Sequence, residues 1–401
     1  MKNENIPNGW EKTSIGSLII EEPKSKIQVG EVANFGEYPF FTSGDDILKH
    51  TEYLVDGEKI YMATGGCANV KYFNKKASYS TDTYVISTNK KLNTKYLYYE
   101  IDRLNYYINA NYFLGSGLKH LQKKDFKKHE IVFPASIKEQ NTIISLLTKI
   151  DIAIEQTKSL MDKYSNIKKG LMHDLFAYGI DEKGQIRSEK THNFKDSSLG
   201  RIPIEWEVVE LGKVSKIQRG KFGHRPRNDP DYYNGQFPFV QTGDVTNSDF
   251  YLKEYSQTLS KLGTTASRLF PVGTIIMTIA ANIGDVAINQ YEVYFPDSLV
   301  GINADETRVN TEFLYYRLIT KKDELNSIAT ESAQKNINYS NLVPLKIAIP
   351  VEIKEQIKIK DKLMLVDEQI RKEQKTMENL QAQKQGLMSD LLTGKVRVKE
   401  E

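Results

Sequence analysis

The chain repeats most of its sequence motifs once, and this internal repeat is the feature that most constrains its fold. The spacing between copies grows from 196 residues at Trp10 and Trp206 to 216 at Gly170 and Gly386. A solenoid would repeat every 20–50 residues or so, whereas one duplication of this length predicts two similar domains in a pseudo-twofold arrangement. The matching segments are 6–11 with 202–207, 38–40 with 237–239, 93–99 with 310–316, 137–140 with 353–356 and 170–175 with 386–391.

Each copy has a globular part followed by a long helical part. The globular parts, residues 1–136 and 204–352, alternate β-rich runs with Gly, Asn and Asp turns. The helical parts, residues 137–178 and 353–395, contain no proline. A charged, glycine-containing stretch at 179–203 connects the two copies. The predicted fold class is α+β, with two mixed α/β domains separated by two long helices.

Both helical parts follow the same heptad pattern, which predicts that they pack against each other. Three heptad positions carry polar residues in both copies, namely Gln140, Thr157 and Lys168 in the first and Gln356, Glu373 and Lys384 in the second. We favour antiparallel pairing within one chain on grounds of symmetry, and the alternative is a homodimeric coiled coil. The predicted seam consists of Ile143, Leu147, Ile150, Ile154, Met161 and Leu171 with Ile359, Leu363, Val366, Ile370, Met377 and Leu387.

Composition places the chain among cytoplasmic proteins with several domains. The single cysteine excludes an internal disulfide framework. The first ten residues lack the apolar core of a signal peptide. The longest apolar stretch, 272–288, is interrupted by polar residues and is too short to span a membrane. The formal net charge of +3 is too small to indicate a nucleic-acid partner, although local patches of charge remain compatible with it.

The repeated motifs resemble those of specificity subunits of type I restriction–modification systems. The resemblance covers nearly the whole chain and rests on Ile-Pro-x-x-Trp-Glu, Pro-Phe…Gly-Asp, Ile-Lys-Glu-Gln and Gly-Leu-Met-x-Asp-Leu, each present in two ordered copies. The connector from Phe176 to Trp206 is similar to the central junction of that family. Each motif alone is weak, and their ordered duplication makes the resemblance specific.

The resemblance implies that each globular part is a target-recognition domain for one half of a split DNA site. It implies double-stranded DNA, two modification subunits and restriction subunits as partners, with no membrane association. It also implies no cofactor in this chain, because S-adenosylmethionine, ATP and Mg²⁺ would belong to the partner subunits. The divergent interiors of the two copies predict two different half-sites and therefore an asymmetric target.

Two groups of residues are the best candidates for DNA contact. A loop in the second copy gathers basic side chains without an acid, which suits phosphate and guanine. A second group precedes the last strand of each globular part and includes Gln and Asn, which suit adenine. Thr42, Ser43, Gln241 and Thr242 beside the Gly-Asp turns are weaker candidates. The first group is Lys216, Arg219, Lys221, Arg225 and Arg227, and the second is Lys119, His120, Lys123 and Lys124 with Gln334, Lys335 and Asn336.

The sequence segments that look like catalytic motifs lack the neighbouring residues that those motifs require, so we expect a non-catalytic subunit. Phe113-Leu114-Gly115-Ser116-Gly117 is superficially like the loop of an adenine methyltransferase, but the residues before it are polar and rich in tyrosine. None of the Gly-Lys pairs is followed by Ser or Thr, as an ATP-binding loop would require. Two alternatives remain, a recognition chain of a related nuclease–methyltransferase with another subunit plan, and a coiled-coil scaffold that does not bind DNA.

Overall fold

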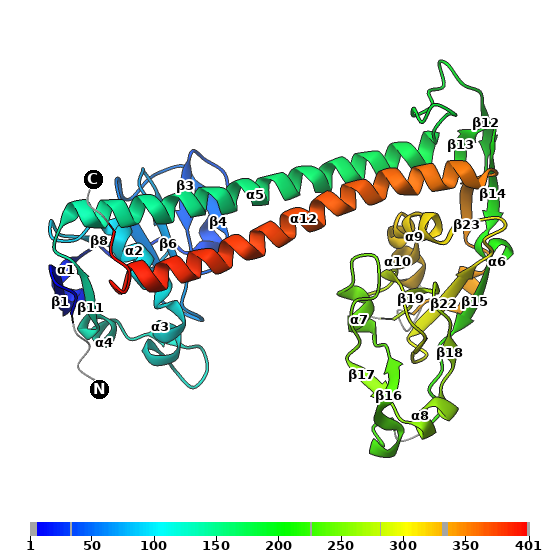
Figure 1. The fold of residues 1–401 in the computed structure, drawn as a ribbon. Helices are drawn as coiled ribbons and strands as arrows, with labels where there is room; N and C mark the ends of the chain where they lie inside the picture. The colour runs from blue at the N-terminus through cyan, green and yellow to red at the C-terminus, as the bar shows by residue number, and fades with distance from the viewer. Residues whose placement is uncertain (1–5, 33, 225–226, 281, 331–335, 399–401) are drawn as a thin grey trace. The chain divides into compact units, whose positions relative to one another are not determined.

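The computed structural model describes residues 6–32, 34–224, 227–280, 282–330 and 336–398 (Figure 1). The chain divides into two compact units. Unit 1 combines residues 1–161 with 372–401, and unit 2 consists of residues 162–371. Each unit therefore contains one globular part and one half of each long helix, so the domain boundaries drawn from the sequence stay a prediction.

The described residues of the globular part of unit 1 form four small β-structures, four short α-helices and one 3₁₀ helix. A pair of strands, β1 and β11, closes the globular part with Trp10 opposite Pro134. A four-stranded sheet in the order β2-β8-β5-β6 and a three-stranded sheet in the order β4-β3-β7 form its centre, and β9 and β10 make a hairpin. The elements are β1 Trp10–Ser14, α1 Ile15–Leu18, β2 Ile19–Glu21, η1 Val29–Glu31, β3 Tyr38–Phe41, β4 Ile47–His50, β5 Lys59–Ala63, β6 Val70–Phe73, β7 Ser78–Tyr79, β8 Thr83–Thr88, α2 Thr94–Arg103, α3 Asn105–Tyr112, β9 Phe113–Leu114, β10 His120–Leu121, α4 Lys123–Lys128 and β11 Glu130–Pro134.

Unit 2 repeats this plan with additional elements. Strands β14 and β23 pair as β1 and β11 do, with Trp206 opposite Pro350. Its sheets have the orders β15-β22-β19-β20 and β17-β16-β21-β18. The elements are β12 Phe194–Ser197, β13 Gly200–Pro203, β14 Trp206–Glu210, α6 Leu211–Val214, β15 Ser215–Arg219, η2 Pro230–Tyr232, β16 Tyr233–Phe239, α7 Thr242–Thr246, β17 Gln257–Leu259, α8 Lys261–Ala266, β18 Leu269–Phe270, β19 Ile275–Thr278, β20 Val286–Ile288, β21 Val293–Tyr294, β22 Leu299–Ala304, α9 Thr311–Ile319, α10 Lys322–Thr330, α11 Tyr339–Leu342 and β23 Lys346–Pro350.

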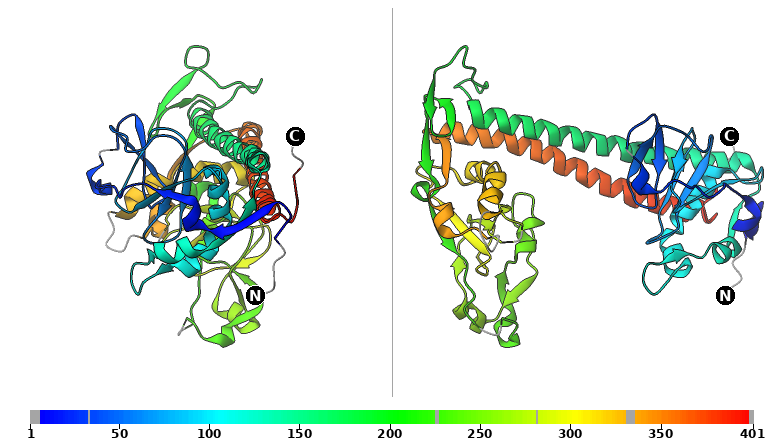
Figure 2. Two further views of the ribbon diagram at one scale, coloured as in Figure 1. Left: turned by 90° about the vertical axis from the view of Figure 1, so that its left-hand side faces the viewer. Right: turned by 180° about the vertical axis from the view of Figure 1, so that it is seen from behind.

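The two long helices are α5, Ile137–Tyr178, and α12, Ile353–Leu391. In unit 1 the start of α5 packs with the end of α12, because Ile143 and Leu147 share a core with Met388 and Leu391. In unit 2 the end of α5 packs with the start of α12, where Leu175 meets Ile359 and Leu363. The pairing is therefore antiparallel in each unit (Figure 2), and the predicted fold class is confirmed.

One residue of the predicted seam is misplaced. Leu387 is 37% exposed, and its neighbour Met388 is buried in the core of unit 1 instead. A straight helix drifts relative to a strict seven-residue repeat. The end of α12 also packs on the globular part of unit 1 and not on α5 alone, so a different face of the helix is buried there.

The lysines of the seam have matching partners in the two units. Lys384 forms an ion pair with Asp151 at 3.0 Å in unit 1, and Lys168 forms the equivalent pair with Asp367 at 2.5 Å in unit 2. Each aspartate also accepts a 2.6 Å hydrogen bond from a tyrosine at matching repeat positions, Tyr99 and Tyr316. These residues interrupt the apolar heptad because they tie the two helices to each other and to the globular part.

Gln140 and Gln356 join each helix to the globular part before it. The Gln140 side-chain oxygen accepts a hydrogen bond from the backbone of Asn93, and its amide nitrogen donates to the carbonyls of Lys91 and Pro134. Gln356 makes the same three bonds to Asn310, Arg308 and Pro350. Both glutamines are fully buried. A buried amide is stable here because its donors and acceptors find partners.

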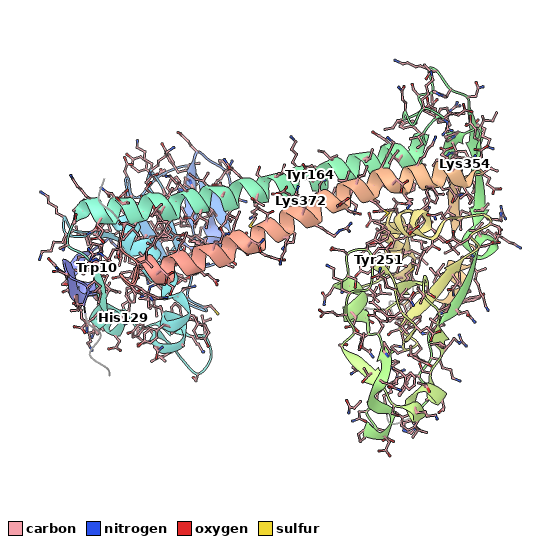
Figure 3. All side chains as sticks on the ribbon, viewed as in Figure 1. Trp10, His129, Tyr164, Tyr251, Lys354 and Lys372 are labelled. Carbon is pink, nitrogen blue, oxygen red and sulfur yellow. The ribbon has the colours of Figure 1, made fainter. Side chains whose placement is uncertain are left out.

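An arginine, a glutamate and a tryptophan close each unit, and we call this cluster the clasp. In unit 2 the Glu355 carboxylate accepts hydrogen bonds from Arg187 at 2.6 and 2.9 Å and from the Trp206 indole at 2.9 Å. In unit 1 Glu139 accepts the corresponding bonds from Arg397 at 2.7 and 2.9 Å and from Trp10 at 3.3 Å. Trp10 is labelled in Figure 3. The arginine comes from the segment that follows a long helix.

Glycines allow the chain to leave each long helix beside the clasp. Gly179 and Gly394 have φ angles of +64° and +70°. A Cβ at Gly179 would lie 2.8 Å from the Trp206 ring, and one at Gly394 would lie 3.2 Å from the Trp10 ring. The left-handed backbone and the close approach both require glycine. The two units therefore match in topology, seam and closure.

Candidate nucleic-acid interface

Four loops of unit 1 meet at one end of its central sheet. The backbone amide of Thr64 donates to the carbonyl of Asp82 at 3.0 Å, and the amide of Leu121 donates to the carbonyl of Thr64 at 3.0 Å. The Ser43 hydroxyl also donates to the carbonyl of Asp82. The loop after β3, the loop after β5, the loop before β8 and the β9–β10 hairpin therefore form one surface, which we call the loop surface of unit 1.

Unit 2 has a loop surface built by two equivalent backbone bonds, together with a hydroxyl bond that has a different acceptor. The amide of Ile279 donates to the carbonyl of Ser298 at 3.1 Å, and the amide of Ile337 donates to the carbonyl of Ile279 at 3.0 Å. The Thr242 hydroxyl donates to the Ser298 hydroxyl at 3.4 Å. The framework thus places Thr42 and Ser43 near Lys119 and His120, and Gln241 and Thr242 near Asn336, although these groups are distant in sequence.

The predicted basic residues of unit 1 differ in their exposure to solvent. Lys119, His120 and Lys124 are exposed. Lys123 instead points its ammonium at the Tyr84 ring, 4.1 Å from the centroid. Burial lowers the pKa of Lys123, while Glu21 opposes this shift. The side chain of Lys123 is therefore engaged inside the unit, and Lys119, His120 and Lys124 are the members that a duplex would meet.

The hairpin that carries Lys119 and His120 depends on a glycine. Gly115 has a φ of +155°, and a Cβ there would lie 2.6 Å from the carbonyl oxygen of Leu118. The hairpin is held to the neighbouring loop by the amide of Gly66, which donates to the carbonyl of Lys119 at 2.9 Å. The glycines that superficially matched a methyltransferase loop are therefore part of the loop that joins β9 and β10.

The basic loop of unit 2 reaches its loop surface through Asp297, the neighbour of Ser298. The Arg219 side chain donates to the Asp297 carbonyl at 2.6 Å, and Arg227 donates to the Asp297 carboxylate at 2.9 Å. Lys221 is exposed on the same loop. Lys216 lies away from this loop. It is on β15, three residues before Arg219, and it pairs with Asn303 on β22. Three strand residues correspond to about 10 Å.

Three of the predicted contact residues lie outside the described part of the chain, namely Arg225, Gln334 and Lys335. Asn336 is described and lies directly before Ile337, whose backbone completes the loop surface of unit 2. The individual DNA contacts therefore stay predictions, and the structure shows which of their residues share a surface.

The loop surfaces also contain residues that the sequence did not single out. Lys71 donates to the carbonyls of Thr42, at 3.2 Å, and of Gly44, and it thereby holds the loop after β3. Burial lowers the pKa of this lysine, and Asp45 and Asp46 oppose the shift. In unit 2 Arg268 donates to the carbonyl of Arg219 at 2.7 Å. No local motif marks these residues, because strand pairing over long sequence distances brings them to the loops.

Among the described residues, no three or more His, Cys, Asp or Glu side chains are grouped so that they could hold a metal ion. Within the same part of the chain, no helix is both long enough and apolar enough to cross a membrane.

Comparison with known proteins relates both copies to one family. Residues 7–161 and 203–382 match the model of the type I restriction modification DNA specificity domain. The chain is 27% identical to the type I restriction enzyme MjaVIII specificity subunit of Methanocaldococcus jannaschii, over 98% of this chain and 94% of that protein. It is 21% identical to the EcoDI specificity subunit of Escherichia coli, over 86% of this chain and 78% of that protein.

Solved structures share the fold. The type I S subunit from M. genitalium aligns with a TM-score of 0.65 at 16% identity and covers 98% of both chains. A chain from a structural study of complex assembly and conformational transition in the type I R-M system aligns with a TM-score of 0.52 at 15% identity. That alignment covers 98% of this chain and 99% of the other.

Proposed function

The chain belongs to the type I restriction–modification DNA specificity family, and from this membership we propose that its two loop surfaces read the two halves of an asymmetric DNA site. The observation that carries the proposal is the pair of loop surfaces built by equivalent backbone bonds and bearing different side chains. Unit 1 presents Thr42, Ser43, Lys119 and His120, whereas unit 2 presents Gln241, Thr242 and Asn336. A shared framework with different donors and acceptors suits two different base sequences.

Base reading and phosphate contact are assigned to different residues of these surfaces. Lys119, Lys124, Lys221 and Arg227 would neutralise phosphates, and such contacts position a protein without reading sequence. Thr42, Ser43, Gln241 and Thr242 carry the hydroxyl and amide groups that distinguish base edges in the major groove. This division predicts that substitutions in the two groups affect affinity and sequence preference differently.

We further propose that this subunit has no catalytic centre and that its partners supply the chemistry. Two modification subunits would bind S-adenosylmethionine and methylate adenine, and restriction subunits would use ATP and Mg²⁺. The relationship to type I specificity subunits supports these assignments.

Mapping of methylated adenines in a host that carries this chain and its modification subunit tests the proposal. We expect a split motif whose two halves differ. Replacing residues 204–352 with the corresponding part of another specificity subunit should change one half of the motif and leave the other half unchanged. A palindromic or contiguous motif would contradict the assignment of one half-site to each unit.

Binding to duplex DNA supplies a second test. The assembled complex should bind with an affinity that falls steeply as salt rises, because phosphate contacts release counterions. Lys119→Ala should lower the slope of log affinity against log salt by about 1, as expected for the loss of one phosphate contact. Lys354→Ala is the matched control, since Lys354 is an exposed lysine on α12 (Figure 3). Salt-independent binding, or none, would favour a scaffold that does not bind DNA.

A further inference from the structure

A leucine in the loop between β9 and β10 is exposed on the loop surface of unit 1. Leu118 is 66% exposed, and no other leucine, isoleucine or valine among the described residues is as exposed. Leu114, on the same hairpin, is 53% exposed. An apolar side chain gains free energy when it leaves water, so its exposure on a binding surface favours a contact that forms in the complex.

The backbone on both sides of Leu118 is held by neighbouring parts of the chain. Before it, the close approach of Gly115 to the Leu118 carbonyl fixes the loop. After it, the Lys119 carbonyl accepts from the amide of Gly66, and His120 forms a bridge with the loop after β5. The leucine is therefore presented by an ordered backbone although its side chain is exposed.

The side chains of Leu118 and His120 lie over the same glycine. A Cβ at Gly65 would lie 3.8 Å from the Cδ2 methyl of Leu118 and 3.6 Å from Nδ1 of His120. Gly65 directly follows Thr64, whose backbone bonds join the loop after β5 to the other loops. The apolar side chain therefore lies within the loop surface, next to a histidine that is predicted to contact DNA.

The sequence of unit 2 has a polar residue at the corresponding position. Leu121 and Ile337 are equivalent, because their backbone amides donate to equivalent loop carbonyls at 3.0 Å in the two units. Three residues before each of them, the sequence has Leu118 in unit 1 and Gln334 in unit 2. Gln334 itself lies outside the described residues. An apolar contact at this position therefore belongs to the half-site of unit 1.

We propose that Leu118 is a specificity-determining residue that contacts the 5-methyl group of a thymine in the half-site of unit 1. Base edges in the major groove present hydrogen-bond donors and acceptors, and thymine is the only unmodified base that adds a methyl group. A leucine side chain can neither donate nor accept a hydrogen bond, so packing it on another base edge would leave polar groups without water or a partner. This inference rests on the proposed function, because it assumes that the loop surface of unit 1 meets DNA.

Deoxyuridine substitution in the DNA tests the assignment without changing the protein. The complex of this chain with its modification subunit is bound to duplexes that carry the mapped motif. The half-site of unit 1 is the half that stays unchanged when residues 204–352 are replaced. Each thymine of that half, on either strand, is replaced in turn by deoxyuridine, which keeps the base pair and lacks the methyl group. We expect one position at which the affinity falls on the order of 5- to 10-fold, as for the loss of one buried methyl group.

Variants of Leu118 connect this preference to the side chain. In Leu118→Ala the ratio of the affinities for thymine and deoxyuridine at that position should fall to about 1, because the methyl group loses its apolar partner. Leu118→Met keeps an apolar side chain of similar volume and should retain the preference. Leu54→Ala is the matched control, since Leu54 is also exposed in unit 1 but follows the end of β4 that is remote from the loop after β3. The control should leave the ratio unchanged.

Two results would overturn the thymine assignment alone. The first is that deoxyuridine is tolerated at every thymine of this half-site, while the wild-type motif is split and binding depends on salt. The second is that Leu118→Ala lowers the affinity for thymine and deoxyuridine duplexes by the same factor, which would assign the leucine to unstacking of a base step or to packing of the loop. A wild-type motif that is not split, or binding that does not depend on salt, would instead overturn the proposed function.

Discussion

The two clasps show how one set of contacts works at two depths of burial. In unit 2 the Arg187 side chain is 7% exposed and Glu355 also accepts from the backbone amide of Ile180 at 3.1 Å. In unit 1 the Arg397 side chain is 43% exposed, although Glu139 is 3% exposed. The same pairing of a guanidinium with a carboxylate is therefore screened by water in unit 1 and largely shielded from it in unit 2.

The depth of burial decides what each pair contributes. Separating a buried ion pair leaves a charge without a partner in a medium that solvates it poorly, and this is costly. An exposed partner regains water when its pair is removed. The comparison teaches that a repeated motif need not have a repeated energy, because the segment that supplies the arginine differs between the units.

Neutralising the clasp carboxylates should give the largest difference between the units. Glu355→Gln leaves the Arg187 charge buried without a carboxylate and should destabilise unit 2 by about 3–5 kcal/mol. Glu139→Gln should destabilise unit 1 by about 1–2 kcal/mol, because Arg397 can be hydrated. Native-state hydrogen exchange, followed separately for amides of each unit, measures both losses. Equal losses would show that burial of the arginine does not set the energy of the clasp.

The buried glutamines should behave alike, in contrast to the clasps. Gln140→Leu and Gln356→Leu each remove three hydrogen bonds of the same kind from fully buried positions. Each substitution should cost about 2–3 kcal/mol, since the former partners are left unsatisfied in the core. The same exchange experiment applies, and Gln374→Leu on the exposed side of α12 is the control. A difference of more than about 1 kcal/mol would mean that the two joints are not equivalent.

Lowering the pH should destabilise unit 1 through a group that unit 2 lacks, and this effect should be smaller than those of the substitutions above. His129 contacts the Tyr112 hydroxyl at 2.9 Å in unit 1 (Figure 3), and unit 2 has Leu345 at the matching repeat position. Burial, helped by the charge of Arg103 and opposed by Glu130, lowers the pKa of His129. The unfolded chain therefore takes up a proton first as pH falls. Unit 1 should lose stability below the unfolded histidine pKa of about 6.5, with a slope of at most about 1.4 kcal/mol per pH unit for this group.

Trp10 fluorescence reports this effect in a Trp206→Phe background, because each unit contains one of the two tryptophans. His129→Leu, which copies the residue of unit 2, should remove the acid-dependent part of the loss in unit 1. An unchanged pH profile in this variant would assign the acid sensitivity to other groups.

The sequence predicted the features of this protein that recur at fixed intervals. The heptads indicated both long helices, and the repeat indicated two similar domains. Of the predicted seam, Ile143 and Leu147 lie in the core of unit 1, and Ile359 and Leu363 lie in that of unit 2. The prediction was wrong at Leu387, because tertiary packing on unit 1 rotated the buried face of α12. The reason for the polar Gln140 and Gln356 was also not evident in the sequence, since it lies in loops that are remote along the chain.

Only part of the candidate interface could be predicted, because the rest depends on contacts between residues that are remote along the chain. Exposed lysines at Lys119 and Lys124 stood out as a basic run, but the same run gave no sign that Lys123 turns toward Tyr84. Arg227 was noticed for its charge, and its ion pair with Asp297 depends on contact across about seventy residues.

The composition of unit 1 from both ends of the chain has a consequence for biosynthesis. Unit 2 is one continuous segment, whereas unit 1 needs residues from 372 onward, including Met388 and Leu391 of its core and Arg397 of its clasp. A ribosome makes these residues after the whole of unit 2. The globular part of unit 1 is therefore translated before that of unit 2, yet its core stays unfilled until the end of α12 has been made.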